Sequence, residues 1–232
     1  MNIFDTDFHC HILPGIDDGS KSVDMSLEMI KMLRAQGVGR IVSTSHFYAH
    51  REQGDVEQFL RKRQYAYESL MAASPAIDNI ILGAEVAIER GISELSGIEK
   101  LAYQGTGYIL LEFPYTSFGD WMIEEIENIT YNFKLTPIIA HLHRYLDDYS
   151  KSQIQAVLSL GAVIQFNNEV FETWGGRRFF KSVADAGHTF VFGSDTHNTS
   201  TRKPNFDLLL KKAKPELIRR SNRFLDMPKE HI

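Results

Sequence analysis

Cysteine is scarce in this sequence and long hydrophobic runs are absent. Cys10 is the only cysteine in 232 residues, which excludes an intrachain disulfide framework and is typical of a reducing cytosol. No run of 18 or more apolar residues occurs, so we expect no helix that inserts into a membrane. Residues 1–10 carry neither a basic segment nor a long apolar one, and we therefore expect no secretory signal and a cytoplasmic protein.

Positive charge is not in excess either, since the sequence has 25 Lys and Arg and 30 Asp and Glu, which gives a net charge of −5. This balance argues against a protein that binds nucleic acid or an anionic membrane through a broad basic surface. Internal repeats, low-complexity tracts and linkers rich in Pro or Ser are also missing. With 43% hydrophobic residues available for a core, the chain is predicted to form a single domain over residues 1–232.

Short apolar segments alternate with longer amphipathic ones along the chain. Strands are predicted at residues 3–11, 40–46, 79–86, 108–113, 136–141, 162–167 and 189–195. Helices are predicted at residues 23–36, 55–73, 121–132, 151–160, 179–186 and 205–212, with a short one around 94–103. This alternation favours an α/β fold whose parallel sheet is covered on both faces, either open or closed as a barrel.

Histidines and carboxylates gather at or near the carboxyl ends of the predicted strands. His9 and His11 are two residues apart, so both side chains point to the same side of a strand. Because the carboxyl ends of parallel strands meet on one face, side chains from six strands are expected to meet there. The candidate metal ligands are His9, His11, Asp18, His46, Glu85, Glu112, His141, Asp195 and His197.

Five imidazoles and four carboxylates are more than one metal ion needs, which indicates two or three bridged ions. Nitrogen and oxygen ligands without thiolate suit Mn, Fe or Zn and argue against a structural zinc site. Taken alone, Asp17-Asp18-Gly19 is typical of a turn and Ser194-Asp195 of a helix cap. The combined pattern over the whole chain favours the metal site.

Three neighbours of the histidine pair have other expected roles. Cys10 alternates away from His9 and His11, which predicts a small core residue. Asp5 and Asp7 share the face of the two histidines, and we expect them to orient the imidazoles.

The motifs resemble, in their order, those of the PHP (polymerase and histidinol phosphatase) superfamily. More narrowly, they resemble its bacterial metal-dependent protein tyrosine phosphatases of the CpsB/YwqE type, which are associated with capsule and exopolysaccharide synthesis. The segments that carry the resemblance are FHCHILPGIDDGS, STSHF at His46, GAEV at Glu85, LLEFP at Glu112, AHLHRY at His141 and GSDTHN at Asp195. The resemblance implies a distorted (βα)7 TIM-like barrel of the PHP fold. It also implies three divalent metal ions, with Mn expected in preference to Fe or Zn.

The resemblance further assigns the ligands to ions. One ion would be held by His9, His11, Glu85 and Asp195, a second by Glu85, Glu112 and His141, and the third by Asp18, His46 and His197. Arg144 and Arg202 match the family's phosphate-binding arginines. His143 stands where the family usually has glutamate, and Ser45 stands where proline is common. Either His143 or a metal-bound water can protonate the leaving group, and the sequence does not decide between them.

These groups suit hydrolysis of phosphate monoesters, because metal ions activate water and neutralise the charge on phosphoryl oxygens. The resemblance implies a metal-dependent protein tyrosine phosphatase that acts on the phosphorylated, flexible tail of a bacterial tyrosine kinase. A cysteine-dependent mechanism is not expected, because no C-x5-R motif follows Cys10. The alternatives are a small-molecule phosphatase of the histidinol-phosphate type, a nuclease of the same superfamily, which the acidic balance disfavours, and a catalytically silent binding module. The sequence is compatible with a homo-oligomer.

Overall fold

The computed structural model describes residues 5–226, and within this range strands and helices alternate along the chain. The strands are β1 (Thr6–Cys10), β2 (Arg40–Ser43), β3 (His46–Phe47), β4 (Ile80–Leu82), β5 (Glu85–Ala87), β6 (Tyr108–Glu112), β7 (Thr136–Ile139), β8 (Val163–Asn167) and β9 (Phe190–Gly193). They form a sheet with the order β1-β2-β4 and a second with the order β3-β5-β6-β7-β8-β9. All pairings are parallel, which confirms the α/β fold with parallel sheets.

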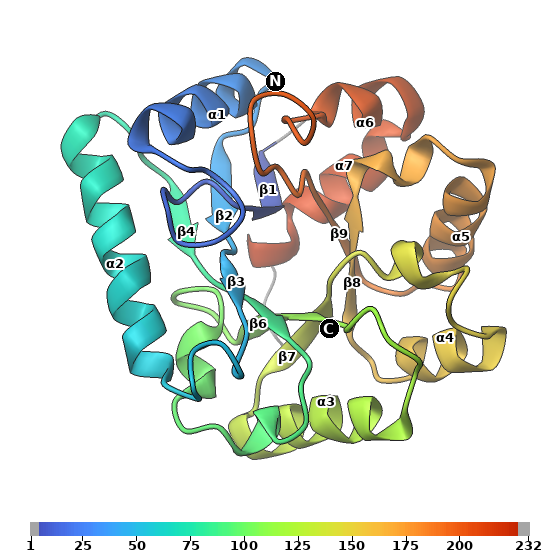
Figure 1. Cartoon of the computed structure of the whole chain (residues 1–232). Coiled ribbons are helices and arrows are strands. Elements are labelled where there is room, and N and C mark those ends of the chain that lie inside the picture. Colours follow the sequence, from blue (N-terminus) through green and yellow to red (C-terminus); the bar gives the residue numbers. More distant parts are fainter. Residues whose placement is uncertain (1–4, 227–232) are drawn as a thin grey trace.

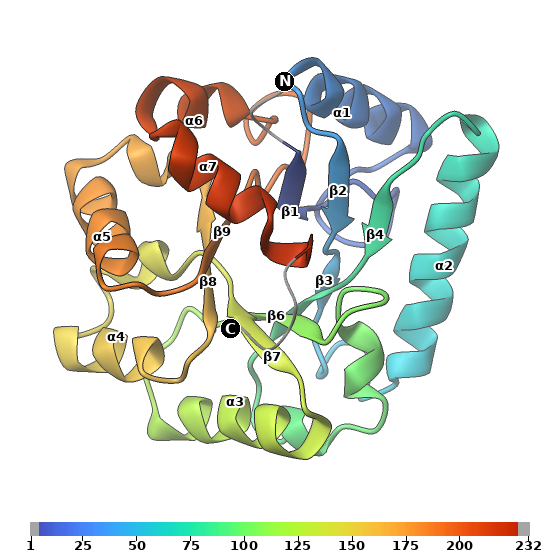
Figure 2. The same ribbon diagram turned by 180° about the vertical axis from the view of Figure 1, so that it is seen from behind.

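All helices but the last lie around the outside of the strands, and the last one crosses one end of them, as Figures 1 and 2 show from opposite sides. The helices are α1 (Val23–Ala35), α2 (Val56–Ala73), α3 (Asp120–Phe133), α4 (Lys151–Leu158), α5 (Trp174–Asp185), α6 (Phe206–Lys212) and α7 (Pro215–Asn222). None of these helices, in the part of the chain that is described, is long and apolar enough to cross a bilayer.

Two of the predicted strands are each broken into two. The strand predicted at 40–46 separates into β2 and β3 at Thr44-Ser45, and the strand predicted at 79–86 separates into β4 and β5 at Gly83-Ala84. The chain passes from the three-stranded sheet to the six-stranded one at these breaks. His46 and Glu85 therefore stand opposite each other at the start of β3 and β5, not at carboxyl ends.

The strands β1 and β9 lie beside each other where the two sheets meet. Cys10 and Thr196 form an isolated parallel bridge, and the His11 amide donates to the Thr196 carbonyl at 2.9 Å. The Asp195 amide donates to the His9 carbonyl at 2.7 Å. These bonds bring the N-terminal histidine pair next to Asp195, although the two segments are far apart in the sequence.

Several helical predictions need correction. The helix predicted at 179–186 begins at Trp174, because the Thr173 side chain caps it by accepting from the Gly176 amide. The helix α7 was not predicted, although Pro215 at its first position is a typical start. The short helix predicted around 94–103 is instead two 3₁₀ turns, Ile92–Glu94 and Ile98–Leu101. Residues 3–4 of the first predicted strand lie outside the described range.

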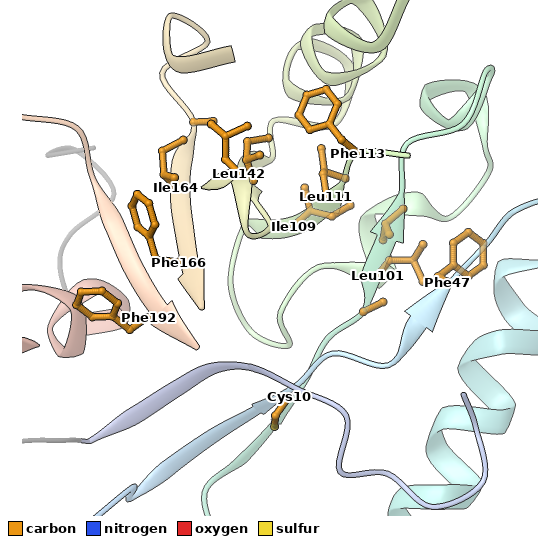
Figure 3. Close-up of a cluster of buried hydrophobic side chains, with 14 of the residues drawn as sticks. Cys10, Phe47, Leu101, Ile109, Leu111, Phe113, Leu142, Ile164, Phe166 and Phe192 are labelled. Carbon is orange, nitrogen blue, oxygen red and sulfur yellow. The ribbon is translucent and has the colours of Figure 1, made fainter. Parts of the chain in front are cut away.

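The core has two parts on the two faces of the strands. The larger part lies between strands and helices and includes Phe47, Leu111, Phe166 and Phe192 (Figure 3). Cys10 belongs to it and is fully buried, as its alternation predicted. The smaller part contains Phe8, Val42, Leu110, Ile138, Val163 and Val191, with Phe224 packed against them from the chain after α7.

The smaller core and the candidate ligands share the inner face of the strands. In β6, Ile109 and Leu111 belong to the larger core, whereas Tyr108 and Leu110 belong to the smaller one. Side chains alternate along a strand, so Glu112 continues the face of Tyr108 and Leu110. Apolar side chains thus fill one end of the interior, and a carboxylate is directed into the other.

Candidate metal centre

Glu85 lies at the centre of the candidate ligands. One of its carboxylate oxygens is 3.0 Å from His9 Nε2, 3.2 Å from His11 Nε2 and 3.2 Å from His46 Nδ1. The other oxygen is 2.9 Å from His141 Nε2. Glu85 is 1% exposed, so four imidazoles surround a carboxylate that has almost no access to water.

Asp195 completes a first group of ligands. Its Oδ1 atom lies 3.5 Å from His9 Nε2 and 3.4 Å from His11 Nε2. His9, His11, Glu85 and Asp195 each offer one ligand atom within 4.8 Å of all the others, and all four residues are buried. These are the four residues that the resemblance assigns to one ion.

A second group consists of Asp18, His46, His197 and His11, whose ligand atoms also lie within 4.8 Å of one another. It contains the three residues expected for another ion, with His11 added. Asp18 Oδ1 is 3.4 Å from both His46 Nε2 and His197 Nε2. Asp18 is well exposed, so this group lies on the side of the cluster that is open to solvent.

The third group departs from the expected ligand set. His46, Glu85 and Glu112 come together, so His46 takes the place expected for His141. His141 still lies against the same carboxylates, with its Nε2 atom 2.9 Å from Glu85 Oε1 and 3.5 Å from Glu112 Oε1. All nine candidate ligands therefore meet in one cluster.

The donor chemistry of the cluster fits divalent cations. His46 Nδ1 and His197 Nε2 are buried and make no hydrogen bond, although each lies close to a carboxylate. The ring nitrogens of His9 and His11 face each other at 3.1 Å. Buried polar atoms rarely lack partners, and imidazole with carboxylate is a ligand set for Mn, Fe and Zn.

Gln165 and Asp17, for which the sequence predicted no orienting role, hold the rings of His9 and His11 and the backbone of His141 and His46. His9 Nδ1 and the His141 amide both contact Gln165 Oε1, at 3.1 and 2.9 Å. His11 Nδ1 lies 2.8 Å from Asp17 Oδ2, and the His46 amide donates to the same oxygen at 2.9 Å. Metal-binding imidazoles commonly use their second nitrogen in this way.

The predicted roles of Asp5 and Asp7 are not found. The exposed Asp5 carboxylate lies 3.8 Å from Arg40, away from the cluster. Asp7 is fully buried, but it accepts hydrogen bonds from the Ser194 hydroxyl and from the amides of Ser194 and His9, not from an imidazole. Asp7 therefore holds β1 against the segment that carries Asp195.

Two candidate ligands have unusual backbone conformations. His141 has φ 31° and Asp195 has φ 51°, in the left-handed region that non-glycine residues rarely adopt. Such strain persists only where the surroundings enforce it, and it is concentrated at functional sites.

Gly193 leaves room for His9, and a side chain there is expected to disturb the cluster. A Cβ atom on Gly193 would lie 2.5 Å from His9 Cβ. We expect Gly193→Ala to lower the free energy of unfolding by about 1–3 kcal/mol, as overpacking does. Urea denaturation measures this loss. Gly175→Ala is the control, because its Cβ would meet nothing within 4 Å in α5, and it is expected to be neutral or stabilising. Equal effects of the two substitutions would contradict the packing argument.

Two arginines lie at the edge of the cluster. Arg144 Nη1 and Arg202 Nη2 lie 2.9 and 2.8 Å from Asp195 Oδ2, the oxygen that faces away from the imidazoles. Arg144 also donates from Nε and Nη2 to Glu169 Oε1, at 3.2 and 2.7 Å. Both arginines are partly exposed, and both line a cavity of about 430 Å³. Glu169 is a further residue of the site that the sequence did not indicate.

His143 stands apart from the other predicted site residues. It is nearly buried and stacks on Phe166 with ring centroids 5.8 Å apart. Its Nε2 atom lies 3.9 Å from Glu169, and neither ring nitrogen makes a hydrogen bond. His143 therefore lies against Phe166 and near Glu169, not among the ligands.

The pKa values of three of the candidate ligands are raised in the cluster. Burial lowers the pKa of His11, but Asp17, Asp195 and Glu85 together outweigh this and the pKa lies well above its ordinary value. Glu85 and Asp195 likewise outweigh burial and raise the pKa of His9. Burial, and then the charge of Glu85, raises the pKa of Glu112 to about 9. At pH 7 Glu112 thus holds a proton, and the raised pKa values of His9 and His11 favour their protonated forms. Ligands must lose such protons when a metal binds.

We therefore expect Mn²⁺ binding at pH 7 to release protons, and the release to decrease as the pH rises past about 9. Calorimetric titration in two buffers of different ionisation enthalpy measures the number released. Glu112→Gln is expected to remove the contribution of Glu112. Binding at pH 7 without proton release would contradict the assignment of these groups.

Comparisons with known proteins agree with this geometry. A family model described as "Capsular polysaccharide synthesis, CpsB/CapC" matches residues 5–221. The chain is 28% identical over 229 residues to tyrosine-protein phosphatase CpsB of Streptococcus pneumoniae, covering 89% of this chain and 90% of that protein.

Two solved structures share the fold. A chain from the crystal structures of YwqE from Bacillus subtilis and CpsB from Streptococcus pneumoniae, unique metal-dependent tyrosine phosphatases, superposes with a TM-score of 0.72 at 23% identity. The match covers 95% of this chain and 92% of that one. Histidinol phosphate phosphatase from Lactococcus lactis, complexed with zinc, L-histidinol and phosphate, gives a TM-score of 0.58 at 14% identity, covering 94% and 93%. Both likenesses support the parallel α/β architecture.

Proposed function

Because this chain belongs to the CpsB/CapC family of capsular polysaccharide synthesis, we propose that it is a metal-dependent protein tyrosine phosphatase. The observation that carries the proposal is the meeting of nine metal-ligating side chains around Glu85, with Arg144 and Arg202 beside them. Relatives named tyrosine-protein phosphatase support the substrate class.

The proposed cofactor is a set of three divalent ions, Mn in preference to Fe or Zn. His9, His11, Glu85 and Asp195 would hold the first, and Asp18, His46 and His197 the second. Glu85, Glu112 and His141 would hold the third, with His46 close to it. Bound ions of this kind lower the pKa of water and neutralise charge on phosphoryl oxygens.

The chain itself supplies the binding of the phosphoryl group. Burial lowers the pKa of Arg144, but Asp195 and Glu169 outweigh it and raise the pKa, so the guanidinium stays charged. Guanidinium groups bind phosphate through paired N–H donors. Asp195 faces the imidazoles with one oxygen and both arginines with the other, so it sets the spacing between the metal ligands and the phosphate-binding groups.

Further parts of the proposal follow the family. The fold would be a distorted (βα)7 barrel, and the neighbouring positions of β1 and β9 support it. The enzyme would act in the cytoplasm on phosphotyrosines in the flexible tail of a bacterial tyrosine kinase that controls capsule or exopolysaccharide synthesis. It would need neither nucleic acid nor membrane insertion, and a homo-oligomer is compatible with this role.

Turnover of two substrates tests the proposal. With Mn²⁺ bound, we expect a kcat/KM for a phosphotyrosine peptide at least about tenfold above that for histidinol phosphate. The reverse order would favour a small-molecule phosphatase. A metal-loaded protein that hydrolyses neither substrate would instead be a silent binding module.

A further inference from the structure

An exposed tyrosine stands next to the phosphate-binding arginine. Tyr115 follows β6 in the loop that leads to α3, and its side chain is 66% exposed. Partial burial raises the pKa of its phenol, and the charges of Arg144, Glu112 and Asp195 act on it. Tyr115 therefore lies near Arg144 at the edge of the candidate metal centre, with most of its side chain open to solvent.

A column of stacked rings supports Tyr115 from within the cluster. The Tyr115 ring stacks on Tyr145 at a centroid distance of 5.2 Å and an interplanar angle of 27°. Tyr145 stacks in turn on His141, at 6.2 Å and 26°. The Tyr145 hydroxyl donates to the Phe113 carbonyl at 2.5 Å, which fixes this middle ring. The position of Tyr115 is therefore set by the same elements that hold His141.

The face of the Tyr115 ring that points away from Tyr145 is uncovered, unlike the rings of two other exposed aromatic side chains, and Tyr65, which is also uncovered, lies on α2. Lys134 covers Tyr131 at 4.5 Å, and Arg178 covers Trp174 at 5.3 Å. Tyr48, which lies against His46, is covered by Arg51 at 4.1 Å. Within residues 5–226, no cation and no second ring covers Tyr115.

A hollow of about 310 Å³ opens beside this ring, lined by Tyr115, Thr116, Ser117, Tyr145 and Asp148. Arg144 lines the cavity that also contains Arg202, and its charge acts on the Tyr115 hydroxyl. A phosphoryl group held by Arg144 would thus lie near the Tyr115 ring. Aromatic rings gain from stacking on each other beyond the burial of their area.

We infer that Tyr115 and the adjoining hollow form the binding site for the aromatic ring of the substrate. The site would favour aryl phosphates over alkyl phosphates through the leaving group rather than the phosphoryl group. The inference rests on the proposed phosphatase function and deepens it. A ring contact present in both the bound substrate and the transition state changes KM and leaves kcat unaffected.

The test uses the metal-loaded protein and two probes, a phosphotyrosine peptide as substrate and inorganic phosphate as competitive inhibitor. We expect Tyr115→Leu to raise KM for the peptide about tenfold, with kcat and the inhibition constant of phosphate within about twofold of wild type. Tyr115→Phe keeps the ring and is expected to retain the KM. Tyr65→Leu is the control, since Tyr65 is an exposed tyrosine on α2 away from the cluster.

Two results would overturn this inference but leave the proposed phosphatase function in place. One is an unchanged KM in Tyr115→Leu, and the other is an equal rise in KM and in the phosphate inhibition constant, which would mean that Tyr115 acts through Arg144. Thermal unfolding of each variant shows whether it is folded. Tyr115→Phe is expected to match wild type both in KM for the peptide and in the inhibition constant of phosphate. A wild-type protein that hydrolyses no phosphotyrosine peptide would overturn the proposed function, and this inference with it.

Discussion

Glu85→Gln is expected to reduce phosphatase turnover at least about 10³-fold and to leave the protein with less bound metal. Glu85 belongs to two of the three ligand groups, and its carboxylate lies within 3.2 Å of four imidazoles. Glutamine keeps the size of the side chain but removes its negative charge and one acceptor oxygen. The loss of one residue would therefore weaken more than one metal position.

Glu89→Gln is the matched control for this substitution. Glu89 follows β5 closely and pairs with His50 at 2.8 Å, but His50 is exposed and lies outside the ligand groups. Metal content by plasma mass spectrometry and turnover of a phosphotyrosine peptide are measured on both variants. Normal turnover in Glu85→Gln, or an equal loss in Glu89→Gln, would show that Glu85 is not the shared ligand.

Removal of metal is expected to lower Tm by roughly 8–16 °C. A ligand at about a thousand times its Kd stabilises the folded state by about 4 kcal/mol, and each kcal/mol shifts Tm by about 2–4 °C in a domain of this size. The cluster joins β1, β3, β5, β6 and the segments after β7 and β9, so bound ions would link both sheets. No such link exists in the unfolded chain.

Differential scanning calorimetry with Mn²⁺ and with a chelator measures this shift. The expected result includes recovery of Tm when Mn²⁺ is restored. The shift is expected to shrink in Glu85→Gln but not in Glu89→Gln. A Tm that is unaffected by chelation, in a protein shown to have bound metal beforehand, would contradict the structural role of the ions.

The sequence was most informative where residues two apart share a face, which holds for His9 and His11 although the pairing of β1 is irregular between Asp7 and Cys10. His9 and His11 could be placed on one face by their spacing, and Glu112 shares the face of Leu110 for the same reason. Cys10 could be assigned to the opposite face, and it is buried in the larger core. The parallel α/β fold followed from the same alternation, repeated along the chain.

The sequence was least informative where the backbone departs from that regularity. The breaks at Thr44-Ser45 and Gly83-Ala84 depend on how the two sheets meet, which is a tertiary effect. The contacts that Gln165 and Glu169 make in the site also depend on the tertiary structure. Gln165 approaches His9 across 156 residues and Glu169 approaches Arg144 across 25, and neither residue belongs to a recognisable motif. Only Asp17, inside the N-terminal turn, was near enough in sequence to suggest an orienting role.

A crystal structure of the protein with Mn²⁺ and phosphate, with anomalous data collected at the manganese edge, tests the central claim most directly. We expect three anomalous peaks among the nine ligands around Glu85, with phosphate contacted by Arg144 and Arg202. Absence of manganese peaks from this cluster, or phosphate bound away from both arginines, would contradict the assignment of the metal centre and its phosphate-binding groups.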